Sequence, residues 1–164
     1  MPTLPPITPE QAGDAAEVDA LIEAAFGPGR LAKAAERLRE GNSPVEGLSV
    51  VARENGRVVG CARMWPVSVG ERPAILLGPF AVDTAWRSRG LGAALVEAAC
   101  ARTKAAGHGL VILVGDAPFF GRLGFQPVPT NSVSLPGPVD MRRVMALALS
   151  QGAADGLAGS VTAG

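Results

Sequence analysis

A long helix between two short apolar segments is the feature that most limits how this chain can fold. Residues 74–82 (AILLGPFAV) and 110–114 (LVILV) are almost entirely apolar, which is typical of buried strands. Between them, Gly90 to Ala106 is rich in alanine, has leucines at helical spacing and ends at Gly107. A strand, a helix and a second strand in this order favour two parallel strands joined by a crossover. The sequence therefore predicts a mixed α/β (α+β) fold.

The other segments predict the rest of the layout. Asn55-Gly56 between two strand-like segments predicts a β-hairpin. Pro79 inside an apolar segment predicts a bulge or an edge, because proline cannot donate to the ladder. We expect helices over 14–26, 31–39, 90–106 and 119–123, and strands over 4–8, 48–53, 58–64, 74–82, 110–114 and 139–149. The 164 residues predict one domain, 1–164, with loose ends at 1–6 and 151–164.

Composition excludes several kinds of chemistry. The chain has one histidine, two cysteines and no tyrosine, so it cannot supply a multi-histidine or four-cysteine metal site or a phenolic acid. We therefore expect no metal. Cys61 and Cys100 are interpreted as buried, reduced thiols.

Charge and hydropathy indicate the cellular location and the kinds of binding partner that we expect for this chain. Fifteen basic and fifteen acidic residues cancel, so no overall field attracts nucleic acid or an anionic membrane. No apolar segment approaches the ~20 residues of a membrane span, and the first residues resemble no export signal. We expect a cytoplasmic protein without nucleic-acid or membrane partners, either a monomer or a homodimer.

The densest chemical signal is the loop that leads into the long helix. Arg87-Ser88-Arg89-Gly90-Leu91-Gly92 places two glycines and two arginines where a strand ends and a helix begins. A helix N-terminus offers free N–H groups and the positive end of its dipole, and glycines let a ligand approach the backbone. The pattern predicts a phosphate or pyrophosphate site.

Spacing separates the possible phosphate ligands. The loop lacks the lysine of a Walker A motif, and Leu95 stands where a dinucleotide fingerprint needs Gly or Ala, which weakens an oxidoreductase interpretation. The Arg-x-x-Gly-x-Gly turn instead resembles the pyrophosphate-binding turn of the GCN5-related N-acetyltransferases (GNAT family). Residues 115–125 (GDAPFFGRLGF) resemble the Tyr-x-x-x-Gly-Phe block of that family, most of all in a bacterial subgroup of predicted acetyltransferases.

The resemblance implies a fold, a co-substrate and a reaction. It implies a mostly antiparallel central sheet with helices on both faces and a bulged fourth strand. It implies acetyl-CoA as co-substrate and an amine, on a small molecule or a protein, that attacks the thioester directly. The residues implied in cofactor binding are Phe80, Ala81, Val82, Arg87, Ser88, Arg89, Gly90, Leu91, Gly92, Ala93 and Phe120.

One position departs from the family pattern. Phe120 stands where the family usually has its tyrosine acid, so the catalytic residues stay unassigned and a non-catalytic acyl-CoA-binding or sensor module is the alternative function. Asp83 and Asp116 are interpreted as turn and helix caps rather than as a base or ligand contact. His108 is interpreted as a solvated residue at a helix end. For Arg63 and Trp65, lining of the acceptor cleft and plain surface packing both stay open.

Overall fold

The computed structural model describes residues 3–27, 33–129 and 131–164. Their strands form one sheet in the order β1-β2-β3-β4-β5-β8-β6, and β9 pairs with both β3 and β7. Only the β4–β5 and β7–β9 pairs are parallel. The strands are β1 (Ile7–Pro9), β2 (Val50–Glu54), β3 (Arg57–Val69), β4 (Arg72–Val82), β5 (Leu110–Val114), β6 (Gln126–Pro127), β7 (Val133–Ser134), β8 (Val144–Ala148) and β9 (Gly159–Ala163).

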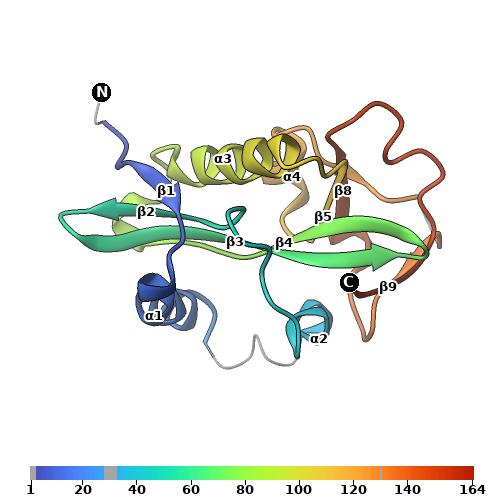
Figure 1. Ribbon diagram of the computed structural model, residues 1–164, viewed down its shortest axis with the longest axis horizontal. Coiled ribbons are helices and arrows are strands. Elements are labelled where there is room, and N and C mark those ends of the chain that lie inside the picture. Colours follow the sequence, from blue (N-terminus) through green and yellow to red (C-terminus); the bar gives the residue numbers. More distant parts are fainter. Residues whose placement is uncertain (1–2, 28–32, 130) are drawn as a thin grey trace.

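Helices cover both faces of this sheet. The helix α3 (Leu91–Ala105) lies along one face, and α1 (Ala15–Phe26) and α2 (Ala34–Arg39) lie along the other, while α4 (Ala117–Gly121) follows β5 (Figure 1). The predicted fold class, a mostly antiparallel sheet between helices, is confirmed. The parallel crossover from β4 through α3 to β5 is confirmed as well, with Ile75 opposite Val111.

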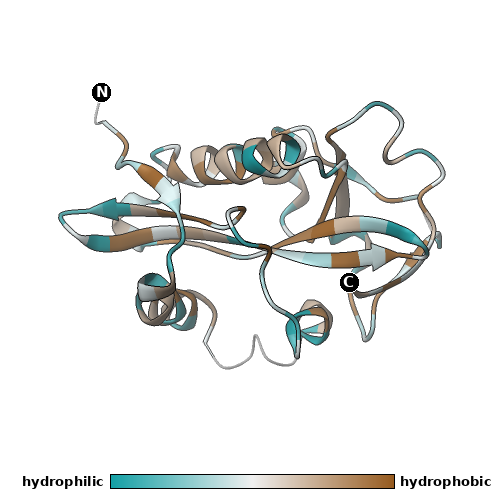
Figure 2. Ribbon diagram, in the orientation of Figure 1, coloured by the Kyte–Doolittle hydropathy of each residue, from teal (hydrophilic) through white to brown (hydrophobic). Residues whose placement is uncertain are grey.

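Apolar residues of the central strands form the core. Figure 2 shows hydrophobic colour along the middle of the sheet and hydrophilic colour at the tip of the β2–β3 hairpin. On one face Leu91, Leu95 and Ala99 of α3 are fully buried against the sheet, and on the other face Val18 and Ile22 of α1 are buried. The helical spacing of these residues explains why each helix presents one apolar side.

The fourth strand carries the predicted bulge. Ala62 of β3 pairs with Phe80 and Met64 pairs with Leu77, so Gly78 and Pro79 together stand opposite the single residue Arg63. The peptide bond between Gly78 and Pro79 is cis. The indole Nε1 of Trp65 donates a hydrogen bond of 2.5 Å to the Gly78 carbonyl, which holds the bulge from the neighbouring strand.

The expectation of a loose C-terminal end is wrong for residues 159–163. They form β9, which runs antiparallel to the end of β3, with Val161 opposite Val69. The reason is that β3 extends five residues past the predicted end at Met64, and β9 pairs with this added length. Leu157 and Val161, each 2 % exposed, anchor the segment although glycine and alanine dominate its composition. Its start lies so close to Gly70 that a side chain at Gly159 would meet the backbone there.

Several smaller boundaries also differ from the expectation. The segment 139–149 begins with a turn of 3₁₀ helix (Met141–Arg143) and becomes strand β8 only at Val144. The strands β6 and β7 are two residues long and were not predicted. The helix expected over 31–39 is described from Ala34 onward, and residues 31–32 lie outside the described part. Residues 3–6 have no regular secondary structure, but the Pro6 carbonyl accepts a hydrogen bond from the Arg53 N–H.

Candidate functional site

The N-terminus of α3 forms an open cradle of backbone N–H groups. Gly90 is its N-cap with a positive φ of 86°, and a glycine cannot cap the helix with a side chain. The first helical bond joins the Ala94 N–H to the Gly90 carbonyl, so the amides of Leu91, Gly92 and Ala93 precede the ladder. A Cβ placed at Gly90 would meet no atom within 4 Å. The positive end of a 15-residue helix therefore faces open space.

Two arginines add charge to this cradle. The Arg87 Nε lies 3.4 Å from the Val82 carbonyl at the end of β4, and the Arg89 guanidinium lies 5.2 Å above the Trp86 ring. Both contacts hold the arginines to the end of β4 and the turn that follows. The cluster is cationic next to the helix N-terminus, which suits an anionic ligand.

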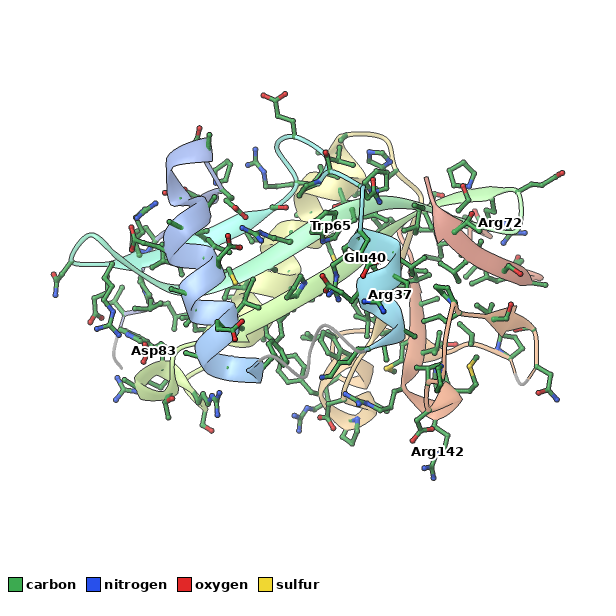
Figure 3. The ribbon with its side chains drawn as sticks, turned by 90° about the horizontal axis from the view of Figure 1, so that it is seen from below. Arg37, Glu40, Trp65, Arg72, Asp83 and Arg142 are labelled. Atoms are coloured by element: carbon green, nitrogen blue, oxygen red, sulfur yellow. The ribbon has the colours of Figure 1, made fainter. Side chains whose placement is uncertain are left out.

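Asp83 is a structural residue of this turn. Its carboxylate accepts a hydrogen bond of 3.0 Å from the Ala85 N–H and pairs with Arg57 at 2.6 Å. The Ala85 hydrogen bond first, and the Arg57 contact after it, hold the pKa of Asp83 below its usual range. A base that takes a proton from an amine needs the opposite shift. The interpretation of Asp83 as a turn cap is confirmed, and Figure 3 shows it at the end of the sheet beside α1.

A cavity of about 320 Å³ lies at this cradle, and we call it the turn cavity. Eight of the predicted cofactor residues line it: Phe80, Ala81, Val82, Arg87, Ser88, Gly90, Gly92 and Ala93. Three do not. Arg89 turns toward Trp86, the Leu91 side chain is fully buried in the core, and Phe120 lines a second cavity. The sequence did not single out Ala25, Phe26 and Trp86, which line the turn cavity too, whereas Phe119, predicted to be an apolar wall of the core or of the CoA arm, also lines it.

The second cavity, of about 550 Å³, opens where β4 and β5 part, and we call it the splay cavity. These strands pair only at Ile75–Val111 and Leu76–Ile112, although β4 continues to Val82 and β5 to Val114. Beyond Leu76 the β5 side of β4 has no ladder partner, and residues 77–80 and 113–116 line the gap. The bulge at Gly78-Pro79 marks the place where the strands diverge.

Four phenylalanines form a wall beside the two cavities. Phe80 stacks on Phe119 with a centroid distance of 5.9 Å, Phe119 meets Phe120 edge to face at 4.9 Å, and Phe120 meets Phe125 at 5.7 Å. Phe80 and Phe119 line both cavities, so the cavities adjoin at this wall. Phe120 is 5 % exposed and lies against Gly115, where a Cβ would be 2.5 Å from its ring. A hydroxyl is missing from the whole wall.

Other candidate residues have structural roles. Asp116 accepts a hydrogen bond of 3.1 Å from the Phe119 N–H, which confirms it as the N-cap of α4. His108 follows the end of α3, as expected, but it is half-buried rather than fully solvated. Neither Arg63 nor Trp65 lines either of these two cavities, and the acceptor-cleft alternative for these two residues stays a prediction.

Arg63 belongs to an ion cluster between β3 and the α1 side of the sheet. It lies 3.0 Å from Glu10 and 2.9 Å from Asp19. Burial alone would lower the pKa of Arg63, but the hydrogen bonds and charges of both acids outweigh burial and raise it. The guanidinium is therefore committed to these acids and does not reach the cavities.

The cysteines take no part in the site. Cys61 and Cys100 are free and buried, as expected. Burial raises the pKa of Cys61 to about 12 and, together with Glu97, that of Cys100 to about 11. Neither thiol is a nucleophile near neutral pH.

The site combines a cradle of helix amides with a gap between two parallel strands, which is the arrangement expected of an acetyltransferase that binds acetyl-CoA. The family model of the GNAT acetyltransferase domain matches residues 46–127, which is half of the chain. The chain belongs to the GNAT acetyltransferase family. The matched part runs from the loop before β2 to the end of β6 and includes both cavities' β4, β5 and α3 walls.

Solved structures show the same fold. The chain is 28 % identical to a GNAT family N-acetyltransferase (YhbS) of Escherichia coli in complex with CoA, covering 100 % of this chain and 92 % of that one, with a TM-score of 0.83. It is 26 % identical to a GNAT family acetyltransferase of Brucella melitensis in complex with acetyl-CoA, covering 88 % of each chain, with a TM-score of 0.67. No curated protein matches the chain at a significant level.

The residues present fit CoA. The open space beside Gly90, the free amides of α3 and two nearby arginines suit a pyrophosphate, and the adjoining splay cavity gives room for an extended arm.

Within residues 3–27, 33–129 and 131–164, no helix is both long and apolar enough to cross a bilayer.

Proposed function

We propose that this protein is an N-acetyltransferase that moves an acetyl group from acetyl-CoA to an amine by direct attack. One observation carries the proposal: the amide cradle of α3 and the gap between β4 and β5 meet at the same aromatic wall. A pyrophosphate held at Arg87–Ala93 would then direct the rest of the molecule past Phe80 into the splay cavity. Acceptor and acetyl group would meet there.

The chain's own groups supply binding, orientation and exclusion of water. The amides of Leu91, Gly92 and Ala93 hold the anion, and Phe80 and Phe119 cover the arm with apolar surface. Between Phe80 and Val82 the backbone groups alternate between β3 and the gap where β4 lacks a β5 partner, and an N–H on the gap side can stabilise charge that develops on a carbonyl oxygen. These contacts place the reacting atoms and need no covalent intermediate with the enzyme.

Phe120 lowers the expected rate without removing the reaction. Bound acetyl-CoA supplies an activated acyl group whose leaving thiol has a pKa of about 8.5, if it behaves like free cysteine. Such a thiolate leaves without full protonation, so the lack of a general acid at position 120 should lower the rate by a factor of about 10²–10⁴ rather than abolish the reaction. The amine, with a pKa of about 10, has to lose a proton on the way. We assign no side chain to that step.

Incubation of the purified protein with labelled acetyl-CoA and a panel of amines tests the proposal. We expect acetylated amine to form at a rate above the uncatalysed background and to saturate with acetyl-CoA. Absence of CoA binding at millimolar ligand, measured by calorimetry, would overturn both the cofactor site and the reaction.

The alternative, a non-catalytic acyl-CoA-binding module, is favoured by the missing hydroxyl at Phe120. The variant Phe120→Tyr separates the two functions, and Phe119→Tyr is the matched control because it adds the same hydroxyl to the neighbouring ring. A large rate gain in Phe120→Tyr alone supports an acetyltransferase. Tight CoA binding without transfer, in the parent and in both variants, supports the binding module.

A further inference from the structure

The charged residues around the splay cavity do not balance. Three cations line it, Lys33 and Arg39 from the α2 region and Arg143 from the turn before β8. Two acids line it, Asp116 and Asp140. The formal sum of these side chains is one positive charge, in a cavity whose floor is the apolar end of β4 and β5.

Both acids are already engaged. The Asp140 carboxylate accepts hydrogen bonds from the Arg142 side chain, at 3.0 Å from Nε and 2.9 Å from Nη2. These bonds first, then the charges of Arg142 and Arg143, hold the pKa of Asp140 below its usual range. Asp116 caps α4 through the Phe119 N–H. Figure 3 shows Arg142, the partner of Asp140, extending away from the body of the protein.

The cations differ in how far they are neutralised. Arg39 pairs with Glu36 at 2.8 Å. Arg143 instead donates from Nε to the Gly115 carbonyl at 3.1 Å, and its own carbonyl accepts from the Gly115 N–H at 2.9 Å. In the described part of the chain, no salt bridge neutralises Arg143 or Lys33, whose Nζ lies 5.1 Å above the Phe26 ring.

The position of Arg143 makes it suited to recognise a ligand. Two bonds to Gly115 fix its backbone and its Nε at the carboxyl end of β5, on the margin of the gap. The Nη groups keep their donors, and a guanidinium fork matches the two oxygens of a carboxylate. Arg143 is exposed, and the cavity that it lines also has an apolar floor at Leu77, Pro79 and Leu113 for the rest of the ligand.

We propose that Arg143, assisted by Lys33, selects acceptor amines that also carry a carboxylate. This specificity rests on the proposed acetyl transfer, since it assigns the acceptor end of the splay cavity. The acceptor is then a small molecule with an amine to be acetylated and an acid group bound at Arg143. A phosphate has the same anionic chemistry, and the test below separates the two.

The test compares matched acceptors. A series of ω-amino acids of increasing length is assayed against the neutral amide of each, and aminoalkyl phosphates are assayed against the parent amino alcohols. We expect KM for the best amino acid to be about tenfold or more below that of its amide, with a smaller change in kcat. A lower KM for the phosphates than for the amino acids would support an anion subsite but overturn the assignment of a carboxylate as its ligand. Equal KM values across all pairs would overturn the proposal.

Variants connect the preference to Arg143. Arg143→Gln is expected to remove the preference, and Arg143→Lys to restore part of it because the charge returns without the fork. Arg122→Gln is the charge-matched control, since Arg122 is exposed and lines neither cavity. A preference that survives in Arg143→Gln would refute the assignment.

A binding measurement keeps this result independent of the proposed function. Calorimetry of the CoA-loaded protein with the amino acid and its amide reports acid recognition without turnover. If no acetyl transfer occurs but the acid still binds more tightly than the amide and Arg143→Gln abolishes the difference, the reaction fails and the anion subsite stands. If transfer occurs without any difference, the subsite fails and the reaction stands.

Discussion

Replacement of Gly92 by alanine is expected to weaken CoA binding while the free energy of unfolding stays nearly unchanged. Gly92 lies in the first turn of α3 and lines the turn cavity. Alanine is favoured over glycine in a helix by about 0.5–1 kcal/mol. Its Cβ would stand 3.1 Å from the Phe80 Cζ, which is tight. The end of a half-buried ring can shift by a few tenths of an ångström, so the two effects roughly offset each other.

Gly90 is the matched control two residues earlier. A Cβ there meets no atom within 4 Å, but the φ of 86° is left-handed. Alanine in that conformation costs about 1–2 kcal/mol. For a chain of this length, 1 kcal/mol changes Tm by about 2–4 °C. Gly90→Ala should therefore lower Tm by several degrees, whereas Gly92→Ala should leave Tm within about 2 °C of the parent.

The effect on CoA follows from the position of the new methyl group. At Gly92 it would stand inside the turn cavity, against Phe80, Phe119 and Val82, where it takes space from a bound pyrophosphate and weakens its hydrogen bonds to the amides. The loss of one hydrogen bond to a charged group costs about 1.5–3 kcal/mol, or about 10–100-fold in Kd. Calorimetry with CoA, beside thermal unfolding without ligand, measures both quantities. An unchanged Kd in Gly92→Ala, or a large loss of stability, would refute the role given to this turn.

Three further predictions concern stability. Burial raises the pKa of Cys61 from about 9 to about 12, so between these pH values the unfolded chain binds fewer protons than the folded one. The free energy of unfolding should therefore fall as pH rises, by up to about 4 kcal/mol. Urea titrations from pH 8 to 11 should show a shallower fall in Cys61→Ala than in the parent. Asp116→Ala removes the cap on the Phe119 N–H and should lower the free energy of unfolding by about 1 kcal/mol; Asp116→Asn, which keeps a capping oxygen, should retain most of it in the same titration. Trp65→Phe leaves the buried Gly78 carbonyl without its indole donor and should lower the free energy of unfolding in urea by about 1–3 kcal/mol. A variant as stable as the parent would show that this hydrogen bond does not stabilise the bulge.

Local patterns predicted much of the framework. The apolar segments 74–82 and 110–114 and the helix between them appear at nearly the predicted bounds, because buried strands and amphipathic helices carry their periodicity in the sequence. Pro79 correctly indicated the bulge, since its missing N–H interrupts a ladder wherever it lies. The cap at Asp116 is equally local. The prediction for residues 157–163 was wrong, because two buried side chains among glycines and alanines give no periodic signal from which a strand could be predicted.

The sequence by itself determined the anion cradle, because the turn from Arg87 to Gly92 is a continuous segment whose glycines and arginines act through neighbouring backbone. Only the tertiary structure decided which distant residues share the splay cavity. Arg143 comes from the far end of the chain and reaches Gly115 through the β5–β8 pair, and Phe26 reaches the cavity from α1. Arg63, which the sequence left open, pairs with Glu10 and Asp19 and lines neither cavity. Side chains alternate across a strand, so which of them meet depends on the register and order of strands that are far apart in the sequence.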